Sequence, residues 1–333
     1  MPFGVTLKTL LSRIYNQYKL CARIVFQTCQ RCYCIALVMD DIVDVNFADG
    51  WFREAPLIVA SREGDLETVC ELMKNEKLDV NLHDRYKSTP LLYASLNNHL
   101  EVVQELLKHP KIDADFQSNC GEIPLHCASF YDGHYKVIRE LLKHDTVDVN
   151  RKRICGRAAL HVASRKGNLR IVRELLKSDK LDVNAGHAYQ DTALTLASQF
   201  NHVDIVRELL GHSNVDVNHI NGNGDTPLIL ASRIGEWGVV MELMKHDNVD
   251  LNVQRRFGYT VLMWASLKGE FDVISALLKH DSLDANLKNI AGSTALDIAR
   301  NCEWLDIVGL LEQHRANWSS NRSDASSRKR RKL

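Results

Sequence analysis

The feature that most constrains how this chain can fold is a segment of 34 residues that recurs in phase along most of its length. Only one interval between neighbouring copies differs, at 35 residues. A period this regular predicts stacked helical repeats, because one such unit cannot bury its apolar face alone. The first predicted helix of each repeat opens, from the first repeat to the eighth, at Pro56, Pro90, Pro124, Ala159, Ala193, Pro227, Val261 and Ala295.

The sixth repeat, residues 216–249, shows the local chemistry most clearly. Thr226 is a good helix N-cap and Pro227 suits the first helical position, so a short helix begins there. Gly235 can take the positive φ that ends this helix, and Val239, Val240, Leu243 and Met244 then recur at helical spacing. Turn-forming residues fill 216–225. Each repeat is therefore predicted to be a helical hairpin preceded by a turn.

Charge is distributed unevenly although the formal net charge of the 333 residues is zero. Residues 1–39 carry five basic and no acidic side chains, and residues 318–333 carry six basic and one acidic, so each end contributes +5 and the body must be about −10. An acidic body argues against nucleic acid as a partner. The nine scattered cysteines favour a reducing compartment. Arg23 and Arg31 interrupt the best apolar stretch, 20–39, so we expect no membrane span.

The two ends differ from the repeats. Residues 1–43 are interpreted as a basic amphipathic segment and a degenerate capping half-repeat, since 37–46 align with 141–150. A mitochondrial transit peptide, or zinc binding by Cys21, Cys29, Cys32 and Cys34, are the less favoured alternatives. The repeat array spans 44–317, and the Ser-rich tail 318–333 is predicted to be disordered. Its basic run could be a nuclear-import signal or merely a solubilising tail, and comprises Arg328, Lys329, Arg330, Arg331 and Lys332.

Short strings within the repeats resemble the ankyrin repeat. They are Thr-Pro-Leu at 89–91 and 226–228, Ile-Pro-Leu-His at 123–126, Ala-Leu-His at 159–161, and Asp-Val-Asn at 44–46, 79–81, 148–150, 182–184 and 216–218. The resemblance implies an all-α ankyrin-repeat solenoid of about eight stacked helix-turn-helix units with β-hairpin fingers and a concave groove. It also implies that His126 and His161 bridge adjacent repeats, and that the asparagines of Asp-Val-Asn can be hydroxylated.

The residue that ends the first helix is Gly or Asn in seven repeats, and both tolerate a left-handed backbone. These residues are Gly64, Asn98, Gly133, Gly167, Asn201, Gly235 and Gly269, whereas the last repeat has Glu303, where the requirement is expected to relax. The single extra residue lies within 130–132 and predicts a bulged connection. A histidine near the end of the second helix recurs and is expected to meet exposed carbonyls there, at His109, His144, His212, His246 and His280.

Binding is favoured over catalysis. No phosphate loop, metal-spaced His-Glu motif or nucleophile elbow is present, so we expect no enzyme activity, cofactor or metal. Aligning the repeats places equivalent residues in columns. The columns that vary from repeat to repeat are those of the finger tips and of the first-helix ends. They hold aromatic and basic residues suited to interface anchors. The candidate partner-binding residues are Trp51, Phe52, Arg85, Tyr86, Leu96, Phe130, Tyr131, Arg165, Lys166, Tyr189, Phe200, Ile234, Arg256, Phe257, Tyr259, Leu267 and Lys268.

The same columns are mildly basic, with eight basic residues (Arg62, Arg85, Arg157, Arg165, Lys166, Arg233, Arg256, Lys268) and six acidic ones (Glu54, Glu63, Glu122, Asp132, Asp191, Asp225). We therefore expect a monomeric, non-enzymatic scaffold or adaptor that binds proteins or peptides with acidic and apolar side chains. The alternative is a substrate-recruiting or regulatory subunit of an enzyme complex such as a ubiquitin ligase. A cytoplasmic or nuclear location is expected.

Overall fold

The computed structural model describes residues 45–46, 48 and 55–316 of the chain. Its residues group into two compact units, which meet between Ile154 and Cys155. Each unit is a stack of helical hairpins and is described by itself. The predicted residues Trp51 and Phe52, the N-terminal segment 1–43 and the basic run 328–332 lie outside the described residues.

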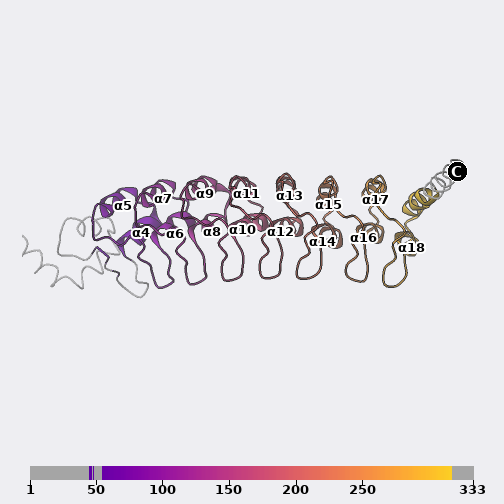
Figure 1. Cartoon of the computed structure of the whole chain (residues 1–333), viewed down its shortest axis with the longest axis horizontal. Helices are drawn as coiled ribbons and strands as arrows, with labels where there is room; N and C mark the ends of the chain where they lie inside the picture. Colours follow the sequence, from indigo (N-terminus) through magenta and orange to yellow (C-terminus); the bar gives the residue numbers. More distant parts are fainter. Residues whose placement is uncertain (1–44, 47, 49–54, 317–333) are drawn as a thin grey trace, which may run out of the picture. The chain divides into compact units, whose positions relative to one another are not determined.

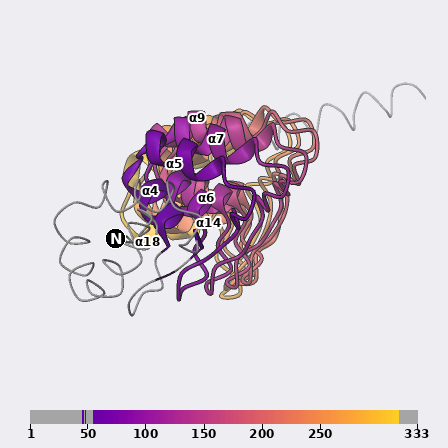
Figure 2. The same ribbon diagram turned by 90° about the vertical axis from the view of Figure 1, so that its left-hand side faces the viewer.

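In unit 1 the first helices of three repeats, α4, α6 and α8, lie in one row (Figure 1). Their partners α5, α7 and α9 form a second row, which the end-on view places above α4 and α6 (Figure 2). Apolar side chains between the rows, such as Leu57, Leu91 and Leu106, are fully buried. The helices span α4 Pro56–Glu63, α5 Leu66–Met73, α6 Pro90–Leu96, α7 Leu100–Leu107, α8 Pro124–Ala128, η1 Asp132–His134 and α9 Tyr135–Leu142.

Unit 2 repeats the same arrangement. One row holds α10, α12, α14, α16 and α18, and the other holds α11, α13, α15 and α17 (Figure 1). Helical backbone continues over residues 305–316, where the second helix of the eighth repeat is expected. The bounds are α10 Ala159–Lys166, α11 Leu169–Leu175, α12 Ala193–Gln199, α13 Val203–Leu210, α14 Pro227–Ile234, α15 Trp237–Leu243, α16 Val261–Lys268, α17 Phe271–Leu277 and α18 Ala295–Asn301.

The first helices begin where the sequence predicts. Thr226 Oγ1 accepts a hydrogen bond from the Ile229 amide at 3.3 Å, and Thr89, Thr192, Thr260 and Thr294 cap their helices in the same way. Three repeats lack the threonine, and two of them use a histidine inside the helix instead. His126 Nδ1 accepts from the Ile123 amide and its Nε2 donates to the Arg151 carbonyl, at 3.2 and 2.8 Å. His126 thus bridges to the next repeat, as the resemblance implied.

Most first helices end in the left-handed conformation. Gly64, Gly167, Gly235 and Gly269 have positive φ, as do Asn98 and Asn201. A side chain at Gly64 would also lie 2.5 Å from Nδ1 of His99, so both backbone angle and space favour glycine there.

Two expectations about these helix ends were wrong. Gly133 does not take a positive φ, because the extra residue of the third repeat is accommodated by the 3₁₀ turn η1, which forms the predicted bulge. Glu303 does keep the left-handed conformation, at φ 59°, so the requirement persists in the last repeat. The helix-to-helix turn, and not the stacking of a further repeat, therefore sets this backbone angle.

The fingers are loops with little β-structure. Among the described residues there is no regular strand, and the single isolated bridge joins Arg255 and Tyr259. Six of the described fingers are closed by a hydrogen bond from the amide of the first residue to the carbonyl of the fifth, as in Asp84 to Ser88 at 3.1 Å and Asn221 to Asp225 at 3.0 Å. A five-residue loop closed in this way leaves no room for a ladder, so the predicted β-hairpin is reduced to its turn.

The asparagine of Asp-Val-Asn explains why this string recurs. In the sixth repeat, Asn218 Nδ2 donates to the Asn248 carbonyl and Asn218 Oδ1 accepts from the Asp250 amide, at 2.7 and 2.9 Å. The side-chain amide thus bridges two backbone groups of the following repeat. The same pair of bonds is made by Asn46, Asn81, Asn184 and Asn252. Asp115 stands at this position in the third repeat.

Candidate functional site

In most of the described fingers the first residue orients the tip. Asp84 Oδ1 accepts hydrogen bonds from the amides of Tyr86 and Ser88, both at 2.8 Å. Asn221 Oδ1 does the same for Asn223 and Asp225, at 3.0 and 2.9 Å. A short polar side chain at this position therefore fixes the loop from within and leaves the tip side chains pointing outward.

Neighbouring fingers are joined through their tips. The amide of Asn119 donates to the Tyr86 carbonyl at 2.9 Å in unit 1. In unit 2 Gly222 donates to Tyr189 at 2.7 Å, and Ile290 donates to Phe257 at 2.9 Å. These backbone bonds hold successive tips in register, so side chains on adjacent fingers form one surface.

First-helix ends lie against the finger bases. The Arg153 guanidinium lies over the Phe130 ring, 5.6 Å from its centroid. Arg233, at the end of α14, donates to Asp225 at 3.0 Å. The two columns that sequence reasoning selected are therefore brought together in each unit. We call the surface formed by finger residues and first-helix ends the finger face of a unit.

Most of the predicted binding residues are exposed on a finger face. Tyr189 is 70% exposed and Phe257 is 73% exposed. Arg165 lies over the Phe200 ring at 5.2 Å, and Arg85 lies over Tyr86 at 4.8 Å, so several aromatics carry a cation beside them. The exposed members are Arg85, Tyr86, Tyr131, Arg165, Lys166, Tyr189, Phe200, Ile234, Arg256, Phe257, Leu267 and Lys268.

Three of the predicted residues are only half exposed. Leu96 and Phe130 lie partly beneath neighbouring side chains, and the Tyr259 ring packs on Trp264 with centroids 4.8 Å apart. Tyr259 is therefore a support for its finger more than a free contact residue. Column position alone does not distinguish a tip side chain that points outward from one that turns back onto the next helix.

The acidic side chains of the finger face are already engaged. In unit 1 Glu122 pairs with Arg153 at 2.7 Å. In unit 2 Asp225 is fully buried, and its Oδ2 lies 3.0 Å from the Arg233 guanidinium and 3.7 Å from that of Arg256. Asp191 accepts from Asn221 Nδ2 at 2.7 Å. Pairing leaves the net charge of the finger face unchanged, and in unit 2 the counted basic residues outnumber the acidic ones, which are only Asp191 and Asp225.

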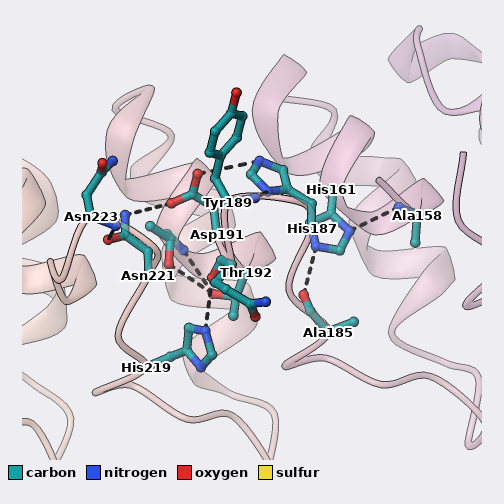
Figure 3. Close-up of polar contacts among 12 residues, drawn as sticks. Ala158, His161, Ala185, His187, Tyr189, Asp191, Thr192, His219, Asn221 and Asn223 are labelled. Carbon is teal, nitrogen blue, oxygen red and sulfur yellow. Dashed lines mark hydrogen bonds and ion pairs between the residues drawn. The ribbon is translucent and has the colours of Figure 1, made fainter. Parts of the chain in front are cut away.

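His187 forms the base of the fifth finger (Figure 3). Its Nδ1 accepts from the Tyr189 amide at 3.0 Å, and its Nε2 faces Asp191 at 3.4 Å. Burial lowers the pKa of His187, and Arg157 and Arg165 lower it further against the opposing effect of Asp191. The neutral ring therefore carries its proton on Nε2 and holds Tyr189 outward. His161 packs face to face with it, 5.9 Å between centroids.

Other titratable groups give no sign of catalytic activation. Burial raises the pKa of the Cys127 thiol well above its ordinary value, and that of Cys70 also rises. Three of the recurring histidines at second-helix ends accept from an amide two residues on, as His212 does from Asn214 at 3.3 Å. The expectation that they meet helix carbonyls was wrong for His109, His212 and His246, because the following turn presents its N–H to Nδ1.

Within the described residues no group of three or more His, Cys, Asp or Glu is placed to hold a metal ion. In the same part of the chain, no helix combines the length and the apolar character that a membrane crossing needs. Cys21, Cys29, Cys32 and Cys34 lie outside it.

A family model described as ankyrin repeats in three copies matches this chain in overlapping segments. The segments are 28–118, 57–153, 106–187, 147–221, 194–289 and 236–322, and together they cover well over half of the chain. The chain belongs to the ankyrin repeat family. The predicted fold class is therefore confirmed.

A solved structure gives the same result for the fold. The chain is similar to the crystal structure of EF0377, an ankyrin repeat protein, with 24% identity and a TM-score of 0.55 over 62% of this chain and 100% of that one. No curated protein matches the sequence. Ankyrin repeats are general modules for binding other proteins, and the fold itself names no particular partner.

Sequence reasoning missed two features of the ankyrin finger face. Ile290 is 79% exposed on the eighth finger and is bonded through its backbone to Phe257. Ile290 occupies the same column as Arg256, so an alignment of finger tips could have identified it. Arg255 opens the seventh finger where most repeats have a short polar residue, and this exception is also visible in the column.

Proposed function

We propose that this chain is a non-enzymatic scaffold or adaptor that binds protein partners through its finger faces. The observation that supports the proposal most strongly is the set of exposed aromatic tips, two of which, Tyr86 and Tyr189, have an amide bound by a buried polar side chain. Tyr86, Tyr189 and Phe257 each project from a finger whose backbone makes hydrogen bonds within the turn and to the next finger. Rigid, exposed aromatic side chains of this kind are typical anchors of protein interfaces.

Charge supports the same proposal and favours a class of partner. The basic side chains of the finger face lie on a body of net charge about −10, as the uneven charge of the sequence requires. A partner segment with carboxylates and apolar side chains would be attracted to the fingers and repelled elsewhere. An extended nucleic acid would meet the acidic body on either side of the fingers.

Affinity capture with two matched triple variants tests the proposal. In the first, Tyr86→Ala, Tyr189→Ala and Phe257→Ala remove the tips. In the control, Phe271→Ala, Trp304→Ala and Leu305→Ala remove exposed apolar residues outside the finger faces. We expect the first variant to lose the partners that the wild-type chain captures, and the control to keep them. Retention of every partner by the tip variant would refute the finger-face assignment.

A role as the substrate-recruiting subunit of an enzyme complex is a narrower form of the same proposal. It requires a second docking segment, and the natural candidates are the two ends of the chain, 1–43 and 318–333. Removal of either end should then abolish association with the enzyme while leaving substrate capture intact.

The basic run Arg328–Lys332 remains a proposal for nuclear import. Replacing its five residues by Gln in a tagged chain should move the fluorescent signal from the nucleus to the cytoplasm. The same distribution for both chains would contradict it.

A further inference from the structure

The seventh finger lacks a contact that two other pairs of neighbouring fingers make. In those pairs the last residue of one finger binds the first residue of the next. Glu122 pairs with Arg153 at 2.7 Å, and Asp191 accepts from Asn221 at 2.7 Å. By position, Asp225 should pair with Arg255.

Asp225 is instead occupied by two other arginines. Its Oδ2 forms ion pairs with Arg233, at the end of α14, and with Arg256, in the seventh finger. The Asp225 side chain is fully buried. Arg255 consequently has no side-chain hydrogen bond and no ion pair among the described residues, and its Nε is shielded from solvent without an acceptor. Two guanidinium groups thus hold this carboxylate, and Arg255, which precedes Arg256 in the chain, has no acidic partner within the part of the chain that the structure describes.

Further donors near this place also lack acceptors. Arg233 Nε and Trp264 Nε1 are buried without a hydrogen-bond partner in the described part of the chain. Trp264 packs on Tyr259, whose backbone exchanges two hydrogen bonds with Arg255. A buried donor without an acceptor is costly, and a carboxylate bound at Arg255 would supply an acceptor there.

An apolar surface adjoins the arginines. Phe257 follows Arg256 directly and is held at φ 64°, an unusual angle for a bulky residue, while its carbonyl accepts from the Ile290 amide. Phe257 and Ile290 are 73% and 79% exposed. Backbone strain of this kind persists where the surroundings impose it and is often associated with binding.

We propose that this seventh-finger site, formed by Arg233, Arg255, Arg256, Phe257, Trp264 and Ile290, binds an acidic protein segment in which a carboxylate side chain lies beside an aromatic or aliphatic one. The inference rests on the proposed function and assigns its partner class to one place. The carboxylate binds the arginines, and the apolar side chain packs on Phe257 and Ile290. The compact size of the cationic site and its apolar border favour a peptide over a polyanion.

A random short-peptide library displayed on phage and selected against the full chain is the test. We expect enriched sequences to place Asp or Glu next to Phe, Tyr, Leu or Ile. The best enriched peptide is then synthesised, and its Kd is measured for the wild type, for Arg255→Gln, and for Arg255→Gln combined with Arg256→Gln. The double variant should bind at least about tenfold more weakly, the size expected for losing one charge-assisted hydrogen bond.

Matched controls make the result specific. The double variant Lys245→Gln and Lys279→Gln removes the same charge outside the finger face and should change Kd by less than about twofold. Phe257→Asn keeps a residue that tolerates the left-handed angle, so it should weaken binding without lowering Tm. The single variant Arg255→Gln removes a side chain with no internal partner, and so it reports on binding even if the double variant unfolds.

Several outcomes would overturn the inference. They are selection of no acidic peptide, equal Kd for the wild type and Arg255→Gln, an equal loss in the lysine control, or displacement of the peptide by a single-stranded oligonucleotide at equal concentration. If selected peptides bind but are lost only with Tyr86→Ala or Tyr189→Ala, the proposed function stands and this site is wrong. If no peptide or protein binds any finger face, both are wrong.

Discussion

Asp115 shows how one atom can break a repeated interaction. Its Oδ2 accepts from the Asp148 amide at 2.9 Å, as the asparagines do. Its Oδ1 is buried without a partner, at the position where the asparagines place a donating Nδ2. Burial raises the pKa of this carboxyl, outweighing the Asp148 amide, which lowers it.

Asp115→Asn should therefore stabilise the chain by about 0.5 to 1.5 kcal/mol, the usual net value of one restored hydrogen bond. The raised pKa means that the folded state prefers the protonated acid. The gain is complete above the folded-state pKa and shrinks as pH falls through it toward the ordinary value of 3.8. Urea unfolding at neutral and acid pH measures this. Equal stability of both chains at neutral pH would contradict it, and Asn184→Asp should show the reverse change.

His187 gives a second prediction at this scale. Its lowered pKa means that the unfolded chain binds a proton more readily than the folded one, so stability falls as pH drops below the ordinary value of 6.5. Protonation would also turn Nδ1 from an acceptor into a donor facing the Tyr189 amide.

His187→Asn should reduce this loss, because Asn221 already orients the sixth finger through Oδ1. Tm measured between about pH 7 and about pH 5 should fall less in the variant than in the wild type. Parallel curves for the two chains would show that His187 does not titrate in this range.

At the scale of the element, most boundaries could be predicted from sequence because each has a local chemical cause. Thr226, Pro227 and Gly235 define α14 without reference to the rest of the chain. The finger was predicted less well, since a hairpin with strands and a bare turn share the same residue types. The partial burial of Phe130 and Tyr259 could not be predicted, because it depends on Arg153 and Trp264, which lie in other elements.

The turn after α18 offers a test of the left-handed requirement. Glu303→Gly should stabilise the eighth repeat by about 0.5 to 1 kcal/mol, because glycine takes φ 59° without steric cost. This value is the net gain after the larger unfolded-state entropy of glycine is subtracted. Glu303→Ala keeps a Cβ and should give no gain. Chemical denaturation of the three chains checks this, and equal stability of the glycine and alanine variants would contradict the explanation.

At the scale of the whole molecule, the repeat period predicts the fold because every repeat must satisfy the same backbone groups of its neighbour. The asparagine and histidine side chains meet this requirement by hydrogen-bonding backbone groups of the following repeat. The proposed binding residues are not fixed by this requirement, since only the backbone of Tyr189 and Phe257 bonds to the next finger. Sequence spacing likewise does not predict that Asp225 pairs with Arg233 and Arg256 and not with Arg255.

The central claim is that partners contact the finger faces and not the row of second helices. A photo-reactive phenylalanine analogue placed at Phe257 or at Phe271 measures this directly, because both positions are exposed aromatics of the same unit. With a captured partner present and under illumination, we expect a covalent adduct from position 257 and none from position 271. Adducts formed from position 271 alone would place the partner on the second helices and contradict the account.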